Sequence, residues 1–216
     1  MANQLEQFRT TLVNKADDYG VSIGQAAVAQ LSNYYALLLT WNPRLHLVAP
    51  CSPAEFATRH VLESLLLSSQ LASAESVVDV GTGAGLPMIP NLIARADIRG
   101  VLIESSHKKT VFLREALRVT GTSDRAEIAP QRFQDLAPPD VGVVTCRALD
   151  NFSEVFPDLI QWSPGKAKLM FFGGDGLRMQ IEGAGLAFRE IRIPNSERRF
   201  LFVIDRHASG LVQDIE

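Results

Sequence analysis

Glycines at alternate positions after a short apolar run form the pattern in this chain most able to support chemistry. Asp79 precedes Gly81, Gly83 and Gly85, and a helical stretch follows them. Glycine is needed where a chain turns tightly or lets a ligand approach the backbone, and the start of a helix favours a negatively charged group. The pattern predicts a loop that binds a cofactor, with a plain glycine-rich turn between strand and helix as the alternative.

The spacing of the glycines distinguishes two classes of cofactor. The dinucleotide fingerprint G-x-G-x-x-G/A fails, because its sixth position is Leu86 when counted from Gly81 and Met88 when counted from Gly83. The order D-x-G-x-G-x-G instead resembles the first motif of class I S-adenosylmethionine-dependent methyltransferases, whose loop wraps the amino-acid end of the cofactor. We therefore expect Asp79 and the three glycines to hold S-adenosylmethionine.

Polar residues at the ends of the later strands extend the predicted site. Glu104 ends the second predicted strand, where a carboxylate can accept hydrogen bonds from ribose hydroxyls. Residues 131–135 follow the third strand, where the adenine lies in such folds. Arg147 ends the fourth strand and faces the predicted cleft, where a guanidinium can bind a phosphate or a carboxylate. The alternatives are a solvated carboxylate, an ordinary loop and a structural ion pair, respectively.

Other polar residues carry less information. Seven basic residues can be interpreted either as a basic rim that binds RNA or as part of a solvated surface. They are Lys108, Lys109, Arg114, Arg132, Arg147, Arg198 and Arg199. The four histidines show no metal-binding spacing, so we expect no metal. The chain has two cysteines, for which free thiols are expected, and Cys146 is expected to be buried.

The elements that position these residues change character near residue 75. Before it, apolar residues recur at helical spacing and predict three helices, at about residues 5–16, 22–42 and 52–71. Ser22 with Gln25, and Ser52 with Glu55, have the spacing of capping boxes, and Pro43 is expected to end the second helix. These helices predict an N-terminal cap over residues 1–74.

After residue 75, β-rich runs alternate with helical stretches, which indicates parallel strands joined by helices. Strands are predicted at residues 76–80, 101–104, 126–129, 141–146, 168–172, 188–193 and 199–204, and helices at 86–96, 107–119 and 152–162. The last two strands are too close for a crossover helix and form a hairpin. The prediction is an α/β, Rossmann-like core over 75–207 with a seven-stranded, mostly parallel sheet containing an antiparallel C-terminal strand, followed by a tail over 208–216.

Composition limits the class of protein. The chain has 216 residues, of which 46% are hydrophobic and 21% charged, so it can bury a sizeable core and is not expected to be disordered. A net charge of −3 excludes a globally basic nucleic-acid coat, although not a local basic patch. The first residues lack the basic and apolar regions of a signal peptide, so we expect a cytoplasmic protein that is not a membrane protein.

Several segments together resemble one methyltransferase family more closely than the glycine loop alone does. They are residues 41–42, 59–65 (R-H-V-L-E-S-L), 79–87, 112–113, 146–148 (C-R-A) and 197–201. The family is that of the small-subunit ribosomal RNA methyltransferase G, also called glucose-inhibited division protein B. The resemblance spans about residues 25–205.

The resemblance implies transfer of a methyl group from S-adenosylmethionine to N7 of a guanine in the 530 loop of 16S ribosomal RNA. It implies cofactor contacts at Gly81, Leu86, Phe133, Gln134 and Arg147. It also implies that Arg132, Arg147 and Arg199 position the substrate, with no general base. The expected partner is 16S ribosomal RNA or the small ribosomal subunit, and a monomer is expected.

The sequence departs from the family pattern on the substrate side. Phe172 stands where the family has lysine, and His46 and Val48 replace an asparagine and a threonine. Met88, Glu63, Phe200 and Gln134 also differ from the usual residues. A diverged member is therefore expected, and two alternatives remain: a methyltransferase with another substrate, or a non-catalytic module that binds the cofactor.

Overall fold

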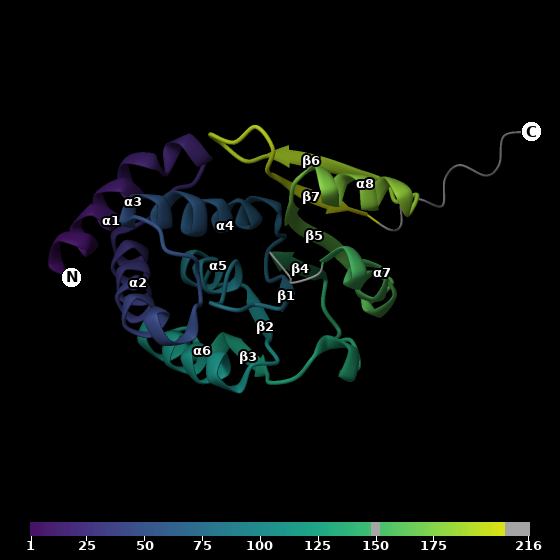
Figure 1. Ribbon diagram of the computed structural model, residues 1–216, viewed down its shortest axis with the longest axis horizontal. Helices are drawn as coiled ribbons and strands as arrows, with labels where there is room; N and C mark the ends of the chain where they lie inside the picture. Colours follow the sequence, from purple (N-terminus) through teal and green to yellow (C-terminus); the bar gives the residue numbers. More distant parts are fainter. Residues whose placement is uncertain (148–151, 206–216) are drawn as a thin grey trace, which may run out of the picture.

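A seven-stranded sheet lies at the centre of the computed structural model, which describes residues 1–147 and 152–205 (Figure 1). The strand order is β3-β2-β1-β4-β5-β7-β6. The strands are β1 Ser76–Val80, β2 Arg99–Ile103, β3 Ala126–Ala129, β4 Val143–Arg147, β5 Lys168–Gly173, β6 Phe188–Arg192 and β7 Phe200–Ile204. Strands β1 to β5 pair in parallel, and β7 pairs antiparallel with both β5 and β6. The predicted topology and terminal hairpin are confirmed.

Four helices connect the strands. They are α5 Met88–Ala94, α6 His107–Thr120, α7 Phe152–Trp162 and α8 Asp175–Gly183. Short 3₁₀ turns cover η1 Asp17–Tyr19, η4 Ser123–Arg125 and η5 Phe133–Asp135. The sequence did not predict α8, because Gly176 and Gly183 lie within it and lower its helical propensity. Its buried Leu177 and Ile181, one turn apart, pack against the sheet and outweigh that cost.

Two long helices open the chain, α1 Ala2–Lys15 and α2 Gln25–Leu45. The predicted capping box at Ser22 is wrong, because Gly24 occupies the N-cap. The predicted stop at Pro43 is also wrong, since α2 continues to Leu45 and ends at His46 in the left-handed conformation. A proline in the last turn removes only one hydrogen bond of the helix, and the apolar side of α2 is buried up to that point.

The third helical segment changes its winding along its length. It runs through α3 Pro53–Glu55, the π-helix η2 Phe56–Leu62, α4 Glu63–Leu65 and the 3₁₀ helix η3 Leu66–Gln70. Its predicted N-cap is confirmed, because the Ser52 hydroxyl accepts a hydrogen bond from the Glu55 amide at 3.1 Å. The widened π turns were not predicted, and such turns are common at functional sites.

The core consists of two apolar clusters, one on each side of the sheet. Alternate residues of β1 face opposite clusters, with Val77 in one and Val78 and Val80 in the other. The first cluster joins α1, α2 and the third helical segment to α5 and α6, and Tyr34 of α2 lies against Phe112 of α6 at 6.4 Å between ring centres. The N-terminal helices thus share their core with the sheet.

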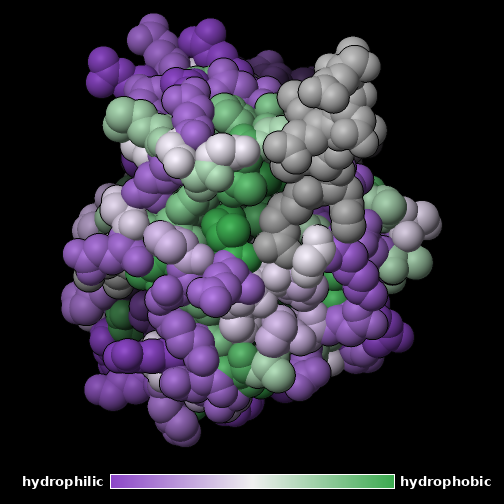
Figure 2. Space-filling view, turned by 90° about the vertical axis from the view of Figure 1, so that its right-hand side faces the viewer, coloured by the Kyte–Doolittle hydropathy of each residue, from purple (hydrophilic) through white to green (hydrophobic). Residues whose placement is uncertain are grey.

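The second cluster lies under α7 and α8. On this side of the molecule, hydrophobic side chains form a band between largely hydrophilic surroundings (Figure 2). Cys146 is buried in β4, as expected. Within residues 1–147 and 152–205, no helix is both long and apolar enough to cross a membrane.

Candidate active site

The glycine loop joins β1 to α5 and forms one wall of a cleft of about 870 Å³. Gly81, Gly83 and Gly85 have φ angles of 67°, 54° and 86°, which lie in the left-handed region that L side chains rarely adopt. Three such positions within five residues turn the chain sharply from strand to helix. Glycine is therefore required by the backbone at each of them.

The glycines differ in what a side chain would contact. A Cβ atom at Gly83 would have only the Gly81 carbonyl oxygen nearby, at 3.9 Å, and Gly83 lines the cleft. A Cβ atom at Gly85 would lie 2.3 Å from Ile89 Cδ1 and 3.2 Å from Leu113 Cδ2. Gly83 thus leaves room for a ligand, whereas Gly85 allows α5 and α6 to pack closely and does not line the cleft.

Asp79 lies below the loop rather than in the cleft. Its side chain is fully buried, and its carboxylate accepts a hydrogen bond from the Thr82 hydroxyl at 2.6 Å. Burial raises the pKa of Asp79 to about 8, although the hydrogen bonds from Thr82 and the Met88 backbone favour the charged form. Asp79 therefore shapes the loop, and Thr82, which the sequence analysis did not select, lines the cleft in its place.

Glu104 fixes the loop from the next strand. It follows β2 directly, is 7% exposed and lines the cleft. One carboxylate oxygen accepts from the Gly83 amide at 3.1 Å and the other from the Ser106 amide at 2.7 Å. Each oxygen keeps a second lone pair. The carboxylate can therefore accept further hydrogen bonds from a bound diol, as the sequence predicts.

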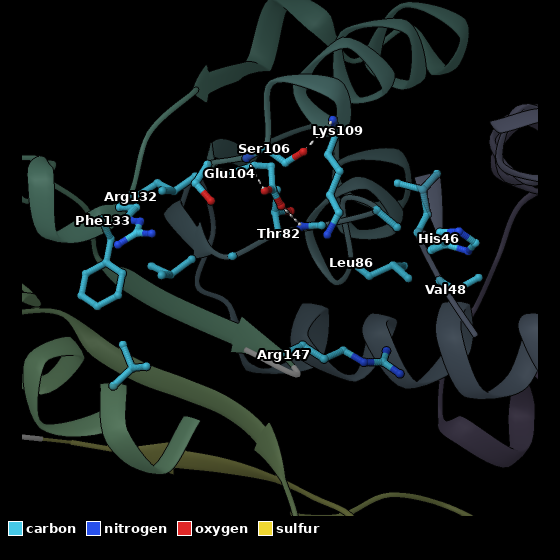
Figure 3. A pocket seen from close by; sticks show the side chains of 18 of the residues that line it. His46, Val48, Thr82, Leu86, Glu104, Ser106, Lys109, Arg132, Phe133 and Arg147 are labelled. Carbon is cyan, nitrogen blue, oxygen red and sulfur yellow. Dashed lines mark hydrogen bonds between the residues drawn. The ribbon is translucent and has the colours of Figure 1, made fainter. Parts of the chain in front are cut away.

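One end of the cleft is formed by the segment after β3. Gln131, Arg132, Phe133 and Gln134 all line it. Phe133 packs edge-on against Trp162 with ring centres 5.5 Å apart, which holds its apolar side chain at the cleft wall. Figure 3 shows Arg132 and Phe133 at one end, His46 and Val48 at the other, and Thr82 and Glu104 between them. The predicted adenine position lies at the Phe133 end.

Arg147 lines the cleft, but its guanidinium is bound mainly to the third helical segment. It donates to the carbonyls of Arg59 (2.6 Å) and His60 (3.3 Å), to the Ser64 hydroxyl (3.0 Å) and to the Glu63 carboxylate (3.5 Å). These contacts use both terminal nitrogens, and burial lowers the pKa of the Arg147 guanidinium. The structural ion pair, which the sequence left open, is present, and only Nε has no partner in the described part of the chain.

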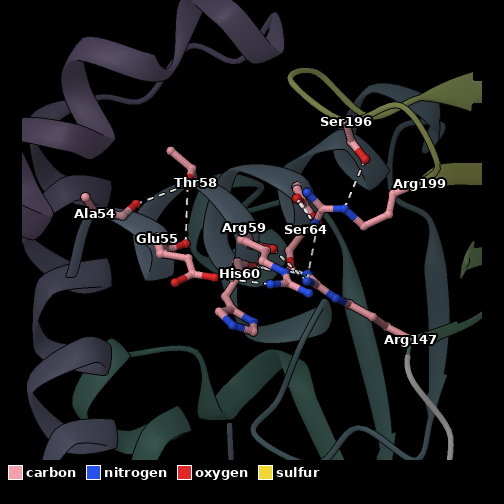
Figure 4. Close-up of polar contacts among 10 residues, drawn as sticks. Ala54, Glu55, Thr58, Arg59, His60, Ser64, Arg147, Ser196 and Arg199 are labelled. Carbon is pink, nitrogen blue, oxygen red and sulfur yellow. Dashed lines mark hydrogen bonds and ion pairs between the residues drawn. The ribbon is translucent and has the colours of Figure 1, made fainter. Parts of the chain in front are cut away.

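Arg199, which directly precedes β7, binds the same carboxylate. It contacts the other oxygen of Glu63 and also donates to the Ser196 hydroxyl at 3.1 Å. Arg147, at the end of β4, and Arg199, just before β7, both approach the Ser64 turn (Figure 4). Arg199 does not line the cleft, whereas Arg132, Arg147 and Lys109 do. The structure therefore does not bring Arg199 to the position where the sequence analysis expected it to meet substrate.

Two departures from the family pattern have a structural explanation. Position 46 is the C-cap of α2 and has φ 48° and ψ 48°, a conformation that asparagine, the family residue, adopts readily and that histidine also tolerates. Phe172 is 8% exposed, and its ring lies 5.7 Å from the Arg147 guanidinium. An aromatic face there attracts the cation that a lysine would repel.

The loop that follows α2 forms the other end of the cleft, and the sequence assigned its His46 and Val48 to the substrate side only through the family resemblance. Asn42 holds the loop with two hydrogen bonds of 3.0 Å to the backbone of Val48. Arg59 and His60 complete this end. Both belong to the R-H segment that carried the family resemblance, and this was the available signal. Ala148, which follows Arg147 in that resemblance, lies outside the described residues.

The residues of the cleft fit S-adenosylmethionine. The space beside Gly83, the carboxylate of Glu104 and the apolar wall at Phe133 could contact its amino-acid part, its ribose and its adenine, respectively. Among residues 1–147 and 152–205, no group of histidine, cysteine, aspartate and glutamate side chains could hold a metal ion.

Comparison with known proteins gives a consistent result. The family model described as rRNA small subunit methyltransferase G (GidB) matches residues 27–187. The ribosomal RNA small subunit methyltransferase G of Xanthomonas axonopodis pv. citri is 41% identical over 135 residues, a match that spans 62% of this chain and 63% of that protein. The protein of the same name from Anaeromyxobacter dehalogenans is 35% identical over 187 residues, which span 83% of this chain and 82% of that one.

Solved structures share the fold at low sequence identity. A crystal structure of a SAM dependent methyltransferase from Aquifex aeolicus has a TM-score of 0.55 and 16% identity, and the match covers 70% of this chain and 93% of that one. At this identity the likeness concerns the fold alone.

Proposed function

The chain belongs to the family of rRNA small subunit methyltransferase G, and from this membership we propose that it transfers a methyl group from S-adenosylmethionine to N7 of a guanine in the 530 loop of 16S ribosomal RNA. The observation that carries the proposal is the loop in which Gly83 faces the cleft while Glu104 binds its amide. We infer that the enzyme acts as a monomer in the cytoplasm, on RNA or on the assembled small subunit.

Methylation at N7 requires little proton transfer by the protein. The N7 lone pair lies in the plane of the base and is unprotonated at neutral pH, so it forms the new bond to carbon without a general base. S-adenosylmethionine, when bound, supplies a methyl carbon whose bonding pair leaves with sulfur. The protein must align N7, carbon and sulfur, with the reacting atoms about 3–3.5 Å apart.

The residues take distinct roles in this proposal. Gly81, Gly83, Leu86 and Glu104 hold the amino-acid part and the ribose, and Phe133 with the Gln134 backbone holds the adenine. Asp79 and Gly85 support the loop without touching the cofactor. Arg132, at the cleft rim, is free to contact RNA phosphates. Arg199 acts at a distance, by holding Glu63 and through it Arg147.

Arg147→Ala tests the site directly. Its side chain fixes the third helical segment to the end of β4 beside the cleft, so its loss should misplace the wall that faces the reacting atoms. We expect the single-turnover rate of methyl transfer to fall at least tenfold, a loss of about 1.4 kcal/mol or more. The matched control is Arg118→Ala, which removes one partner of an exposed ion pair on α6, away from the cleft. An unchanged rate in Arg147→Ala would remove this residue from the mechanism.

A methyltransferase that acts on another substrate is the second candidate. Val48 in the cleft and Phe172 beside Arg147 are apolar where the family has polar side chains, and the net charge is −3. Binding of RNA weakens steeply with salt, because phosphate contacts release counterions. Substrate binding that does not change between 50 and 200 mM salt would favour this second candidate.

A further inference from the structure

The end of the cleft opposite Phe133 has no role in holding the cofactor under the proposed function. His46, Val48 and Ala49 line it, together with Arg59 and His60. It adjoins Leu86 and Arg147, so a group placed there lies next to the amino-acid side of the cofactor site (Figure 3). The acceptor base must occupy such a position if it is to reach the methyl group.

His60 is the side chain at this end that is best placed to recognise a base. Its backbone carbonyl is bound by the Ser64 hydroxyl and by Arg147, and its ring lies 5.2 Å from that of Phe56. These contacts hold the residue in the π-helix, while its imidazole projects away from the helix axis (Figure 4). The imidazole nitrogens make no hydrogen bond to any residue in 1–147 or 152–205.

The surroundings keep His60 neutral. Burial lowers the pKa of His60 to about 3, and the charges of Arg147, Arg59 and Arg199 act in the same direction. A neutral imidazole has one N–H donor and one acceptor nitrogen. It can thus pair with the mixed donors and acceptors of a base edge, which a protonated ring could not.

We propose that the imidazole of His60 hydrogen-bonds the acceptor guanine at this end of the cleft and selects it for methylation. The inference rests on the proposed function and adds the residue that reads the base. In guanine, the O6 acceptor lies next to N7, so an N–H donor at O6 would orient N7 toward the methyl group. Because N7 gains a positive charge when it is methylated, a neutral donor also avoids the repulsion that a second cation would cause.

The test compares His60→Ala and His60→Gln with the wild type. The measurements are kcat/KM for unmodified small ribosomal subunits at saturating S-adenosylmethionine, and the Kd for S-adenosylmethionine by calorimetry. We expect His60→Ala to lower kcat/KM at least tenfold while the cofactor Kd changes less than twofold. Glutamine keeps a donor and an acceptor, so His60→Gln should recover part of the activity. His107→Ala, an exposed histidine outside the cleft, is the control.

Three results would overturn the inference. An unchanged kcat/KM in His60→Ala would show that the imidazole does not contact the base. An equal loss in kcat/KM and in cofactor affinity would assign His60 to the cofactor, and equal losses in the alanine and glutamine variants would assign it a packing role. A wild-type protein that binds the cofactor but methylates no subunit would instead contradict the proposed function, on which this inference depends.

Discussion

At the residue scale, the glycines of the loop meet two different requirements, a left-handed backbone conformation and space for a neighbouring group. The sequence pattern alone does not distinguish them. All three glycines are needed by the backbone, since each has a positive φ angle. Gly83 also leaves open space in the cleft, while Gly85 makes room for Ile89 and Leu113. Alanine substitutions at these two positions should therefore affect different properties of the protein.

Gly83→Ala should weaken cofactor binding more than stability. The left-handed conformation costs alanine about 1–2 kcal/mol, and the new methyl group extends into the cleft. We expect the Kd for S-adenosylmethionine to rise at least tenfold. Gly85→Ala should lower the free energy of unfolding by about 2–4 kcal/mol, since strain adds to the contact with Ile89. Calorimetry and urea unfolding of both variants check this, and the reverse assignment would contradict it.

Asp79→Asn should remove a decline in stability with rising pH. The folded-state pKa of about 8 lies above the value of about 3.9 of an unfolded chain, so the folded state binds the extra proton between them. The stabilisation is complete below pH 4 and is lost as the pH rises toward 8. Between pH 5 and 8 the wild type loses up to about 4 kcal/mol of unfolding free energy through this group, and the Asp79→Asn variant does not. Urea unfolding at pH 5, 6.5 and 8 measures it.

His60 affects the pH dependence of stability in the opposite direction, so the wild type must be compared with Asp79→Asn. Its folded-state pKa of about 3 lies below the unfolded value, so its contribution is lost as the pH falls below about 6.5. The contribution is common to wild type and variant and cancels in their difference. Parallel stability curves for the two proteins from pH 5 to 8 would show that Asp79 titrates near its ordinary pKa.

At the scale of elements, Glu63 ties the third helical segment to two strands. It is nearly fully buried and binds Arg147 at the end of β4 and Arg199 just before β7. Glu63→Gln leaves both guanidinium groups without their counter-charge, so we expect a loss of unfolding free energy on the order of 3 kcal/mol. Glu115→Gln, in an exposed pair on α6, should change little. Equal effects in urea unfolding would contradict the role of Glu63.

Local patterns predicted the elements well where the apolar periodicity was regular. The predicted bounds of β1, β3 and α7 match the structure, and the alternation of strands and helices indicated the parallel pairing that β1 to β5 show. The end of α2 and the whole of α8 were wrong or missed, because Pro43 and two glycines suggest breaks there that packing overrides. Intrinsic propensity is weak compared with burial in such segments.

The site was predictable where a function follows from position on a strand. Gly83, Glu104 and Phe133 all line the cleft, as their places after β1, β2 and β3 imply. The sequence could not assign Arg147 and Arg199 to one carboxylate, because Glu63 lies 84 residues from Arg147 and 136 from Arg199. Contacts of such separation are fixed only by the folded arrangement of the cap on the sheet.

At the scale of the whole molecule, the N-terminal helices and the sheet form one apolar cluster. Tyr34 of α2 is fully buried and donates to the Ala84 carbonyl in the glycine loop at 2.8 Å. The division near residue 75 therefore marks a change of sequence pattern, while the residues on both sides of it contribute to the same apolar cluster. It follows that the cap and the sheet should unfold together.

The two tryptophans test this cooperativity, since Trp41 lies in α2 and Trp162 in α7. In Trp41→Phe and in Trp162→Phe, the urea midpoint from the remaining tryptophan should equal the midpoint from far-UV circular dichroism of the same variant. Coincident transitions are the mark of two-state unfolding. A cap that melts at lower urea would appear as an earlier transition of Trp41 in Trp162→Phe, and would show that residues 1–74 are a separate unit.

The whole protein is expected to methylate one guanine of the ribosomal RNA. The most direct measurement is methyl transfer from labelled S-adenosylmethionine to unmodified small ribosomal subunits, with the product mapped by strand cleavage specific for N7-methylguanine. We predict a single cleavage site, in the 530 loop of 16S ribosomal RNA. No transfer by a preparation that binds the cofactor, or methylation at another position, would contradict the claim.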